Sequence, residues 1–101
     1  MENNAYKEQL AEHLLQIKAI QLNTQEPFTW TSGIKSPVYC DNRKLLSYPL
    51  VRDFVRDGFV ALVKEYFPTT DYIAGVATAG IPHGAIVADA LNLPFVYVRS
   101  K

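Results

Sequence analysis

A strand-like segment, a helix pattern and a second strand-like segment follow one another late in this chain, and this order most constrains its fold. The first segment, residues 72–76, reads YIAGV and is apolar without alternation, which is typical of a strand covered on both faces. Helical character follows over residues 82–91, and residues 95–98 read FVYV, a second strand of the buried type. This order predicts a βαβ unit with parallel strands and a right-handed crossover.

Ligands of such units bind beyond the carboxyl ends of the strands. The first strand is followed by ATAG (77–80), whose small side chains allow backbone N–H groups at the start of the next helix to approach a phosphate. Small residues at a strand-to-helix turn also serve close packing alone. Both explanations stay open for three glycines, Gly75, Gly80 and Gly84.

The second strand ends at two basic residues, Arg99 and Lys101. They fit either a contact with an anion or a solvated loop end. The chain has ten basic and ten acidic residues and a formal net charge of zero, so it has no overall field that attracts nucleic acid. We therefore expect any anion site to be local, and no nucleic-acid partner.

Two helices are predicted upstream of this unit. Apolar residues at helical spacing indicate an amphipathic helix over residues 5–19. A second helix is expected over 48–67, with Ser47 as its N-cap, Pro49 in its first turn and Pro68 as its stop.

Between these helices, residues 28–43 read FTWTSGIKSPVYCDNR and resemble a β-hairpin. The alternating FTWTS is one strand, the turn lies around Gly33, and PVYCD is the second strand, with its proline at a position that suits a strand's first residue. Asp41 and Arg43, at the end of the segment, fit a local ion pair or a ligand contact, and both explanations stay open.

Cysteine content and hydropathy limit the location of the protein. The single Cys40 cannot form an internal disulfide and is most simply a small, half-buried apolar residue. The first residues lack the apolar core of a signal peptide, and no run approaches the roughly 18 apolar residues of a membrane span. We expect a cytoplasmic protein without a membrane partner.

Three segments, FTWTSGIKSPVYCDNR (28–43), GVATAGIPHGA (75–85) and FVYVRSK (95–101), occur in an order and at separations that resemble the N-terminal half of the orotate phosphoribosyltransferases. The resemblance implies a type I phosphoribosyltransferase-like α/β fold, a parallel sheet flanked by helices with a small N-terminal hood lobe. It divides the chain into residues 1–43, the helix and hood, and residues 44–101, the first part of the core. The rest of that core is absent from this sequence.

The resemblance also implies an activity. Members of the family join orotate to 5-phosphoribosyl 1-diphosphate with Mg²⁺, giving orotidine 5′-monophosphate and pyrophosphate in pyrimidine synthesis. The Mg²⁺ is expected to be held mainly through the diphosphate, and the protein is expected to be a homodimer with shared active sites. Residues 1–101 alone are expected to be inactive.

By the same resemblance, the hood segment helps to enclose orotate. Its expected contacts are the backbone and side chains of Ser32, Gly33, Lys35, Tyr39 and Cys40. Tyr39 and Cys40 lie where the family has its base-stacking pair, although that pair is often aromatic at both positions. Thr31 stands where many relatives have a lysine, which leaves that contact to the backbone or to Lys35.

The diphosphate is expected at the two strand ends. Thr78, Ala79 and Gly80 would offer backbone N–H groups, and Ala79 stands where many relatives have a lysine. Arg99 matches a residue that the family contributes to the diphosphate, commonly across the dimer interface, and Lys101 lies beside it. A guanidinium suits this role because it binds phosphate oxygens in a bidentate manner.

No residue of this chain is expected to act as an acid, a base or a metal ligand. His83 fits a polar residue at a helix N-terminus, and His13 fits a surface position. Two other functions stay open: a ligand-sensing, nucleic-acid-binding regulator with the same fold, and a non-catalytic fragment or interaction module.

Overall fold

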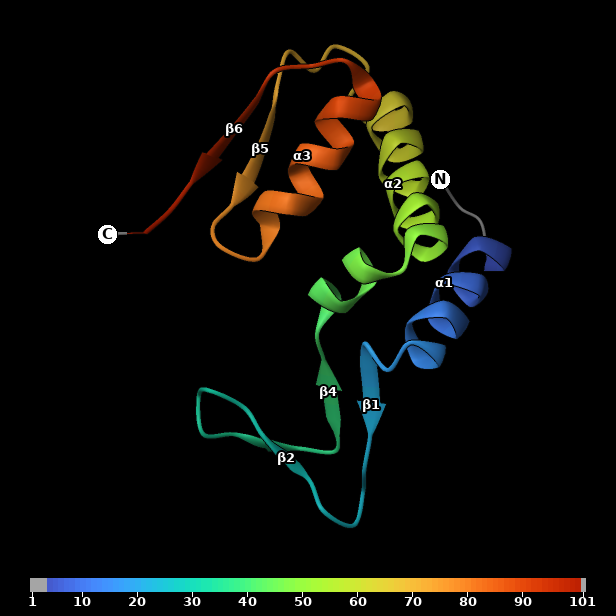
Figure 1. The fold of residues 1–101 in the computed structure, drawn as a ribbon, viewed down its shortest axis with the longest axis vertical. Helices are drawn as coiled ribbons and strands as arrows, with labels where there is room; N and C mark the ends of the chain where they lie inside the picture. Colours follow the sequence, from blue (N-terminus) through green and yellow to red (C-terminus); the bar gives the residue numbers. More distant parts are fainter. Residues whose placement is uncertain (1–3, 101) are drawn as a thin grey trace. The chain divides into compact units, whose positions relative to one another are not determined.

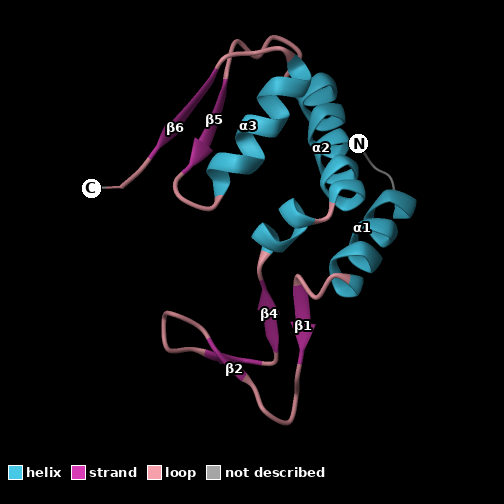
Figure 2. Cartoon of the chain, in the orientation of Figure 1, coloured by secondary structure: helices cyan, strands magenta, loops and turns pink. Residues whose placement is uncertain are grey.

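The computed structural model describes residues 4–100, which divide into two compact units, residues 4–51 and 52–100 (Figure 1). In chain order, the elements are α1 (Asn4–Gln16), β1 (Ile20–Leu22), β2 (Phe28–Thr29), β3 (Lys35–Ser36), β4 (Val38–Cys40), the 3₁₀ helix η1 (Asn42–Ser47), α2 (Pro49–Tyr66), β5 (Ile73–Val76), α3 (Gly80–Leu91) and β6 (Phe95–Val98). Figure 2 shows the same chain coloured by helix, strand and loop.

The second unit contains the predicted βαβ arrangement. β5 and β6 pair in parallel, with Ile73 opposite Phe95 and Val76 opposite Val98. One further bond, from the N–H of Ala77 to the carbonyl oxygen of Val98 (2.8 Å), extends the ladder beyond the strands. The parallel pairing predicted from the sequence is confirmed, and it brings the two carboxyl strand ends to one edge.

Helix α3 packs directly on β5 and β6, and two glycines make this close approach possible. A Cβ atom at Gly75 would lie 2.7 Å from the carbonyl oxygen of Gly80, and one at Gly84 would lie 2.7 Å from Cε1 of Phe95. A Cβ at Gly80 would meet nothing closer than 3.8 Å. Close packing therefore accounts for Gly75 and Gly84, whereas Gly80 is not needed for it.

The helix boundaries differ slightly from the prediction. α3 begins at Gly80, two residues earlier than expected, because Pro82 is tolerated within a first helical turn. It ends at Asn92, whose left-handed φ of 56° places its N–H on the carbonyls of Ala88 and Asp89. α2 ends one residue before Phe67, as the following proline requires.

The prediction that helix 48–67 also packs on the parallel sheet is not confirmed and stays a prediction, because in the described part of the chain the close backbone approach to β5 and β6 is that of α3. Ser47 is not the N-cap of α2 either. It is the last residue of η1, and Asp41 caps that 3₁₀ helix instead, accepting a hydrogen bond from the N–H of Arg43.

The first unit contains two short antiparallel pairs rather than one hairpin. β2 pairs with β3, Phe28 opposite Ser36, and β4 pairs with β1, Gln21 opposite Tyr39. The predicted pairing of FTWTS with PVYCD is thus wrong for its second arm. Pro37, which has no N–H, separates β3 from β4, and each strand takes a different partner.

The end of α1 explains why β1 follows it so closely. Lys18 has a left-handed φ of 61°, which ends the helix three residues before the expected Ala19. The Nζ atom of Lys44, on η1, donates to the carbonyl oxygen of Lys18 (3.2 Å), and Ala19 is fully buried.

The 3₁₀ helix η1 belongs to the first unit, and its Leu45 is also buried. The domain division after residue 43 stays a prediction.

Candidate functional site

The turn between β5 and α3 presents backbone N–H groups at the carboxyl edge of the sheet. Thr78 and Ala79 are exposed and Gly80 is half-buried. Ala79 precedes the helix without a side-chain cap, and the Ala77–Thr78 peptide bond is cis. Within residues 4–100, none of the three N–H groups donates to a side chain or to backbone outside the helix. The start of a helix carries partial positive charge, so this turn is suited to an anion.

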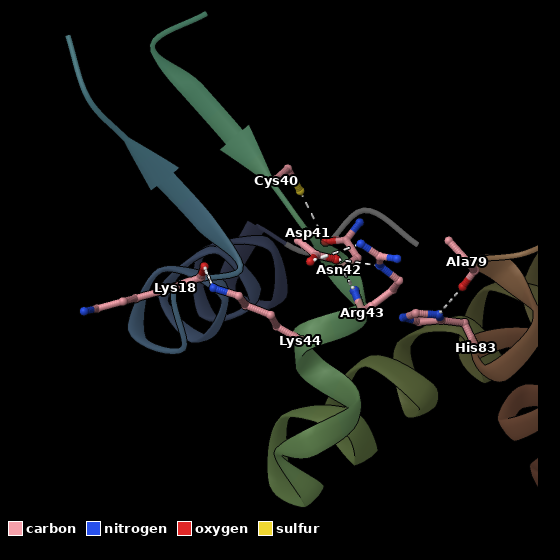
Figure 3. A network of polar contacts seen from close by, with 8 residues as sticks. All are labelled: Lys18, Cys40, Asp41, Asn42, Arg43, Lys44, Ala79 and His83. Carbon is pink, nitrogen blue, oxygen red and sulfur yellow. Dashed lines mark hydrogen bonds and ion pairs between the residues drawn. The ribbon is translucent and has the colours of Figure 1, made fainter. Parts of the chain in front are cut away.

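His83 holds the same turn from the helix side. Its Nδ1 atom lies 3.1 Å from the carbonyl oxygen of Ala79, one helical turn earlier, and a protonated Nδ1 donates this hydrogen bond (Figure 3). The ring is half-buried. This agrees with the expected polar residue at a helix N-terminus. The hydrogen bond pairs the carbonyl oxygen of Ala79, which lies in the turn that is suited to an anion.

Arg99 directly follows β6 and is exposed at the same edge as the turn. Its guanidinium carbon lies 5.7 Å from the centroid of the Tyr97 ring. Sequence reasoning missed Tyr97, although an aromatic residue near the end of a strand, two positions before an arginine, is a readable signal of a contact between the ring and the guanidinium. Lys101, the other expected diphosphate contact, lies outside the described residues.

The expected orotate contacts lie in the first unit and fall into two groups. Ser32 and Gly33 form the exposed turn of the β2–β3 hairpin, and Gly33 has a φ of 89°, a conformation that favours glycine. Lys35 is exposed on β3, opposite Thr29, and Thr31 is exposed in the same turn. The turn is closed by a hydrogen bond from the N–H of Gly33 to the carbonyl oxygen of Trp30 (2.8 Å).

Tyr39 and Cys40 form the second group, on β4. Tyr39 is half-buried, and its ring centroid lies 5.6 Å from that of Phe28 with the planes tilted by 38°. Cys40 is exposed, and its Sγ atom contacts Oδ1 of Asn42 at 3.3 Å. Successive strand residues point to opposite faces of the sheet, so the two side chains do not share one face. The indole of Trp30 ties the hairpin to β4 by donating to the carbonyl oxygen of Val38 (2.9 Å).

Asp41 and Arg43 form the local ion pair that the sequence left as one of two explanations. Nε of Arg43 lies 3.0 Å from Oδ1 of Asp41, and the backbone N–H of Arg43 donates to the same oxygen (Figure 3). The hydrogen bond from the Arg43 side chain is the main cause that lowers the pKa of Asp41. The pair stabilises the start of η1, so its presence is explained without a ligand.

This pair gives a prediction with a defined sign. Replacing Arg43 by glutamine should raise the pKa of Asp41 toward its ordinary value of about 3.9. Because that pKa is lowered in the folded protein, the stabilisation is present at neutral pH and is lost as the pH falls below about 4. A carboxyl ¹³C titration of Asp41 in both proteins measures the change, and an Asp41 pKa that is the same in both would contradict it.

Within residues 4–100 there is neither a cluster of metal-ligating side chains nor a helix that could span a membrane. No three His, Cys, Asp or Glu side chains gather there as ligands for a metal ion. None of the helices is both long and apolar enough to cross a bilayer.

Comparison with known proteins identifies what this chain is similar to. No family model matches it. It is 62% identical over 93 residues to an orotate phosphoribosyltransferase from Streptococcus thermophilus, a match that covers 92% of this chain and 44% of the relative. Over most of its length, this chain is similar to proteins named orotate phosphoribosyltransferase. It spans less than half the length of the curated relatives it matches.

Solved structures agree with this relationship. An orotate phosphoribosyltransferase from Aeropyrum pernix is 32% identical, with a TM-score of 0.79 over 91% of this chain and 50% of that one. A UMP synthase from Leishmania donovani is 27% identical, with a TM-score of 0.78 over 98% of this chain and 21% of that one. The predicted fold class is confirmed: the chain has part of the type I phosphoribosyltransferase fold, with a small parallel sheet.

Proposed function

We propose that the complete protein transfers the phosphoribosyl group of 5-phosphoribosyl 1-diphosphate to orotate, giving orotidine 5′-monophosphate and pyrophosphate. The observation that carries this proposal is the 62% identity to a protein named orotate phosphoribosyltransferase, which extends over 92% of this chain. The parallel strands support it, because they bring the N–H groups of residues 78–80 and the guanidinium of Arg99 to one edge.

In this proposal the diphosphate of the donor binds at that edge. The backbone N–H groups of Thr78, Ala79 and Gly80 donate to its oxygens, and Arg99, with Lys101, supplies positive charge. Ala79 brings no charge of its own, so affinity depends on the backbone and on Arg99. Breaking the bond from ribose C1 to oxygen leaves negative charge on the departing diphosphate, which these groups stabilise.

The hood residues are proposed to hold orotate. A planar anion needs a flat apolar surface and fixed hydrogen-bond donors. The paired rings of Phe28 and Tyr39 offer the surface, and the Ser32–Gly33 turn, with Lys35, offers donors and a positive charge. Because Tyr39 and Cys40 point to opposite faces of β4, we assign stacking to Tyr39 and leave Cys40 to the edge of the site.

The proposal includes Mg²⁺ as an ion that arrives with the donor. We expect this ion to be held mainly by the diphosphate oxygens, as the family resemblance implies. Bound there, Mg²⁺ would neutralise charge on the leaving group. The residues of this chain contribute by binding and orienting the diphosphate that carries it.

We further propose that the complete protein is a cytoplasmic homodimer whose active sites share basic residues across the interface, as the family resemblance implies. Two-fold assembly is the commonest arrangement of soluble oligomers. Sedimentation of the complete protein as a monomer at micromolar concentration would contradict the assembly.

An activity assay and a measurement of donor binding together separate the proposed function from its alternatives. Loss of orotate absorbance is followed with the complete protein, with and without 5-phosphoribosyl 1-diphosphate, and with residues 1–101 alone. We expect donor-dependent loss with the complete protein and none with residues 1–101. Donor binding by the complete protein without orotate loss would favour the regulator, and neither binding nor loss would favour the non-catalytic module.

A further inference from the structure

The side chain of Arg99 differs from those of Arg43 and Arg56 in the group that it contacts. Arg43 is paired with Asp41, and Arg56 with Asp53 and Asp57, at 2.9–3.1 Å. Within residues 4–100, no carboxylate lies within ion-pair distance of Arg99, and its guanidinium carbon lies 5.7 Å from the centroid of the Tyr97 ring. This distance lies within the range of a cation–π interaction.

The strand geometry places this pair near the carboxyl edge of the sheet. Side chains two residues apart on a strand share a face, so Phe95 and Tyr97 lie on one side of β6. Arg99 is the first residue after β6, and its guanidinium lies beside the Tyr97 ring. Phe95 lies against α3 and β5. Its ring atoms lie 2.7 Å and 3.1 Å from the points where a Cβ atom would stand if Gly84 and Gly75 carried one. Tyr97 and Arg99 therefore follow Phe95 toward the carboxyl edge.

The face of an aromatic ring can hold a guanidinium without occupying its hydrogen-bond donors. A carboxylate partner would occupy N–H groups and cancel charge, whereas the contact with Tyr97 leaves the five N–H donors and the full charge for an anion. Tyr97 is 53% exposed as a residue, so its side chain is accessible to such a contact. An arginine that is ordered before binding loses less side-chain freedom when the anion arrives.

We propose that Tyr97 is a positioning residue, which holds the guanidinium of Arg99 at the strand end so that it is ready for the diphosphate of the donor. This inference rests on the proposed function, because it gives Arg99 the diphosphate as its ligand. Tyr97 acts through Arg99 and does not contact the substrate itself.

The test uses four variants of the complete protein: Tyr97→Leu, Tyr97→Phe, Arg99→Ala and the double variant Tyr97→Leu/Arg99→Ala. Binding of 5-phosphoribosyl 1-diphosphate and of inorganic diphosphate with Mg²⁺ is measured by calorimetry. An exposed cation–π contact predicts about two- to fivefold weaker binding in Tyr97→Leu. Tyr97→Phe should bind like the unchanged protein, because it keeps the ring face.

The double variant separates positioning from a merely structural role. If Tyr97 acts through Arg99, Tyr97→Leu has no further effect once Arg99 is alanine. An equal loss in both backgrounds, or an equal loss in Tyr97→Phe, would overturn the inference. The inference would also be overturned if Tyr97→Leu bound the donor as well as the unchanged protein does while Arg99→Ala bound it weakly. That result would leave the proposed function intact.

A second readout does not depend on turnover. The side-chain protons of Arg99 should show an upfield ring-current shift in NMR spectra that Tyr97→Phe keeps and Tyr97→Leu removes. Absence of that shift would overturn the inference even in an active enzyme. The proposed function can also fail while the inference stands. In that case the complete protein shows the ring-current shift and inorganic diphosphate binds more weakly to Tyr97→Leu, but orotate is never consumed.

Discussion

Replacing Arg99 by alanine in the complete protein should lower donor affinity or turnover by about 10- to 150-fold, because a charge-assisted hydrogen bond is worth roughly 1.5–3 kcal/mol. Arg99 is exposed, and its guanidinium carbon lies 5.7 Å from the centroid of the Tyr97 ring. Folding should change by no more than about 0.5 kcal/mol, as is usual for a surface substitution. Steady-state kinetics with varied donor, together with urea unfolding, measure both effects.

Arg99→Lys is the matched control for this prediction. It keeps the charge but loses the planar fork that binds two phosphate oxygens at once, so it should restore only part of the loss. Arg99→Ala with unaltered donor KM and kcat would return Arg99 to a solvated loop end. The backbone of residues 78–80 would then be the one diphosphate contact that the described residues provide.

Replacing Gly75 by alanine should destabilise the second unit by about 1–3 kcal/mol, the usual cost of overpacking. The added Cβ would stand 2.7 Å from the carbonyl oxygen of Gly80 and 3.1 Å from Cζ of Phe95. A backbone oxygen cannot turn aside as a flexible side chain does, so α3 and the turn before it must move away from β5. The free energy of unfolding in urea measures the effect.

Gly80→Ala is the control for stability. Its added Cβ would meet the nearest atoms at 3.8 Å and 3.9 Å, an ordinary contact distance. Alanine also suits the first position of a helix better than glycine. We expect Gly80→Ala to be as stable as the unchanged protein, and equal stability of Gly75→Ala would contradict the close packing that we describe.

The sequence predicted the second unit well because its signals are local and strong. The runs that become β5 and β6 are apolar without interruption, and the helix between them makes parallel pairing the expected result. Pro68 marked the end of α2 to within one residue. The packing role of Gly75 and Gly84 could not be separated from a role in anion binding, because it depends on how closely α3 approaches the sheet.

The first unit was predicted less well, for physical reasons that particular residues illustrate. Lys18 adopts a left-handed conformation without being glycine or asparagine, so nothing in the sequence marked the end of α1. β2 and β3 are two residues long, too short for a reliable alternating pattern. The pairing of β4 with β1 depends on contacts between distant residues, such as the N–H of Asp41 with the carbonyl oxygen of Ala19.

The candidate site, too, could be predicted from the sequence only in part. The strand ends and Arg99 could be located from the sequence, since a βαβ unit fixes where they meet. The opposite faces of Tyr39 and Cys40 follow once β4 is known to be a regular strand. The hydrogen bond from His83 to Ala79 has a helical spacing that the sequence contains, but it became visible only when α3 was found to begin at Gly80.

The central claim is that the turn at residues 78–80 and Arg99 hold the diphosphate of the donor at the shared strand edge. A crystal structure of the complete protein with Mg²⁺ and 5-phosphoribosyl 1-diphosphate tests it most directly. We predict diphosphate oxygens within about 2.7–3.2 Å of the N–H groups of residues 78–80 and of an Arg99 guanidinium from the same or the neighbouring subunit. A donor bound with its diphosphate away from both groups would contradict the claim.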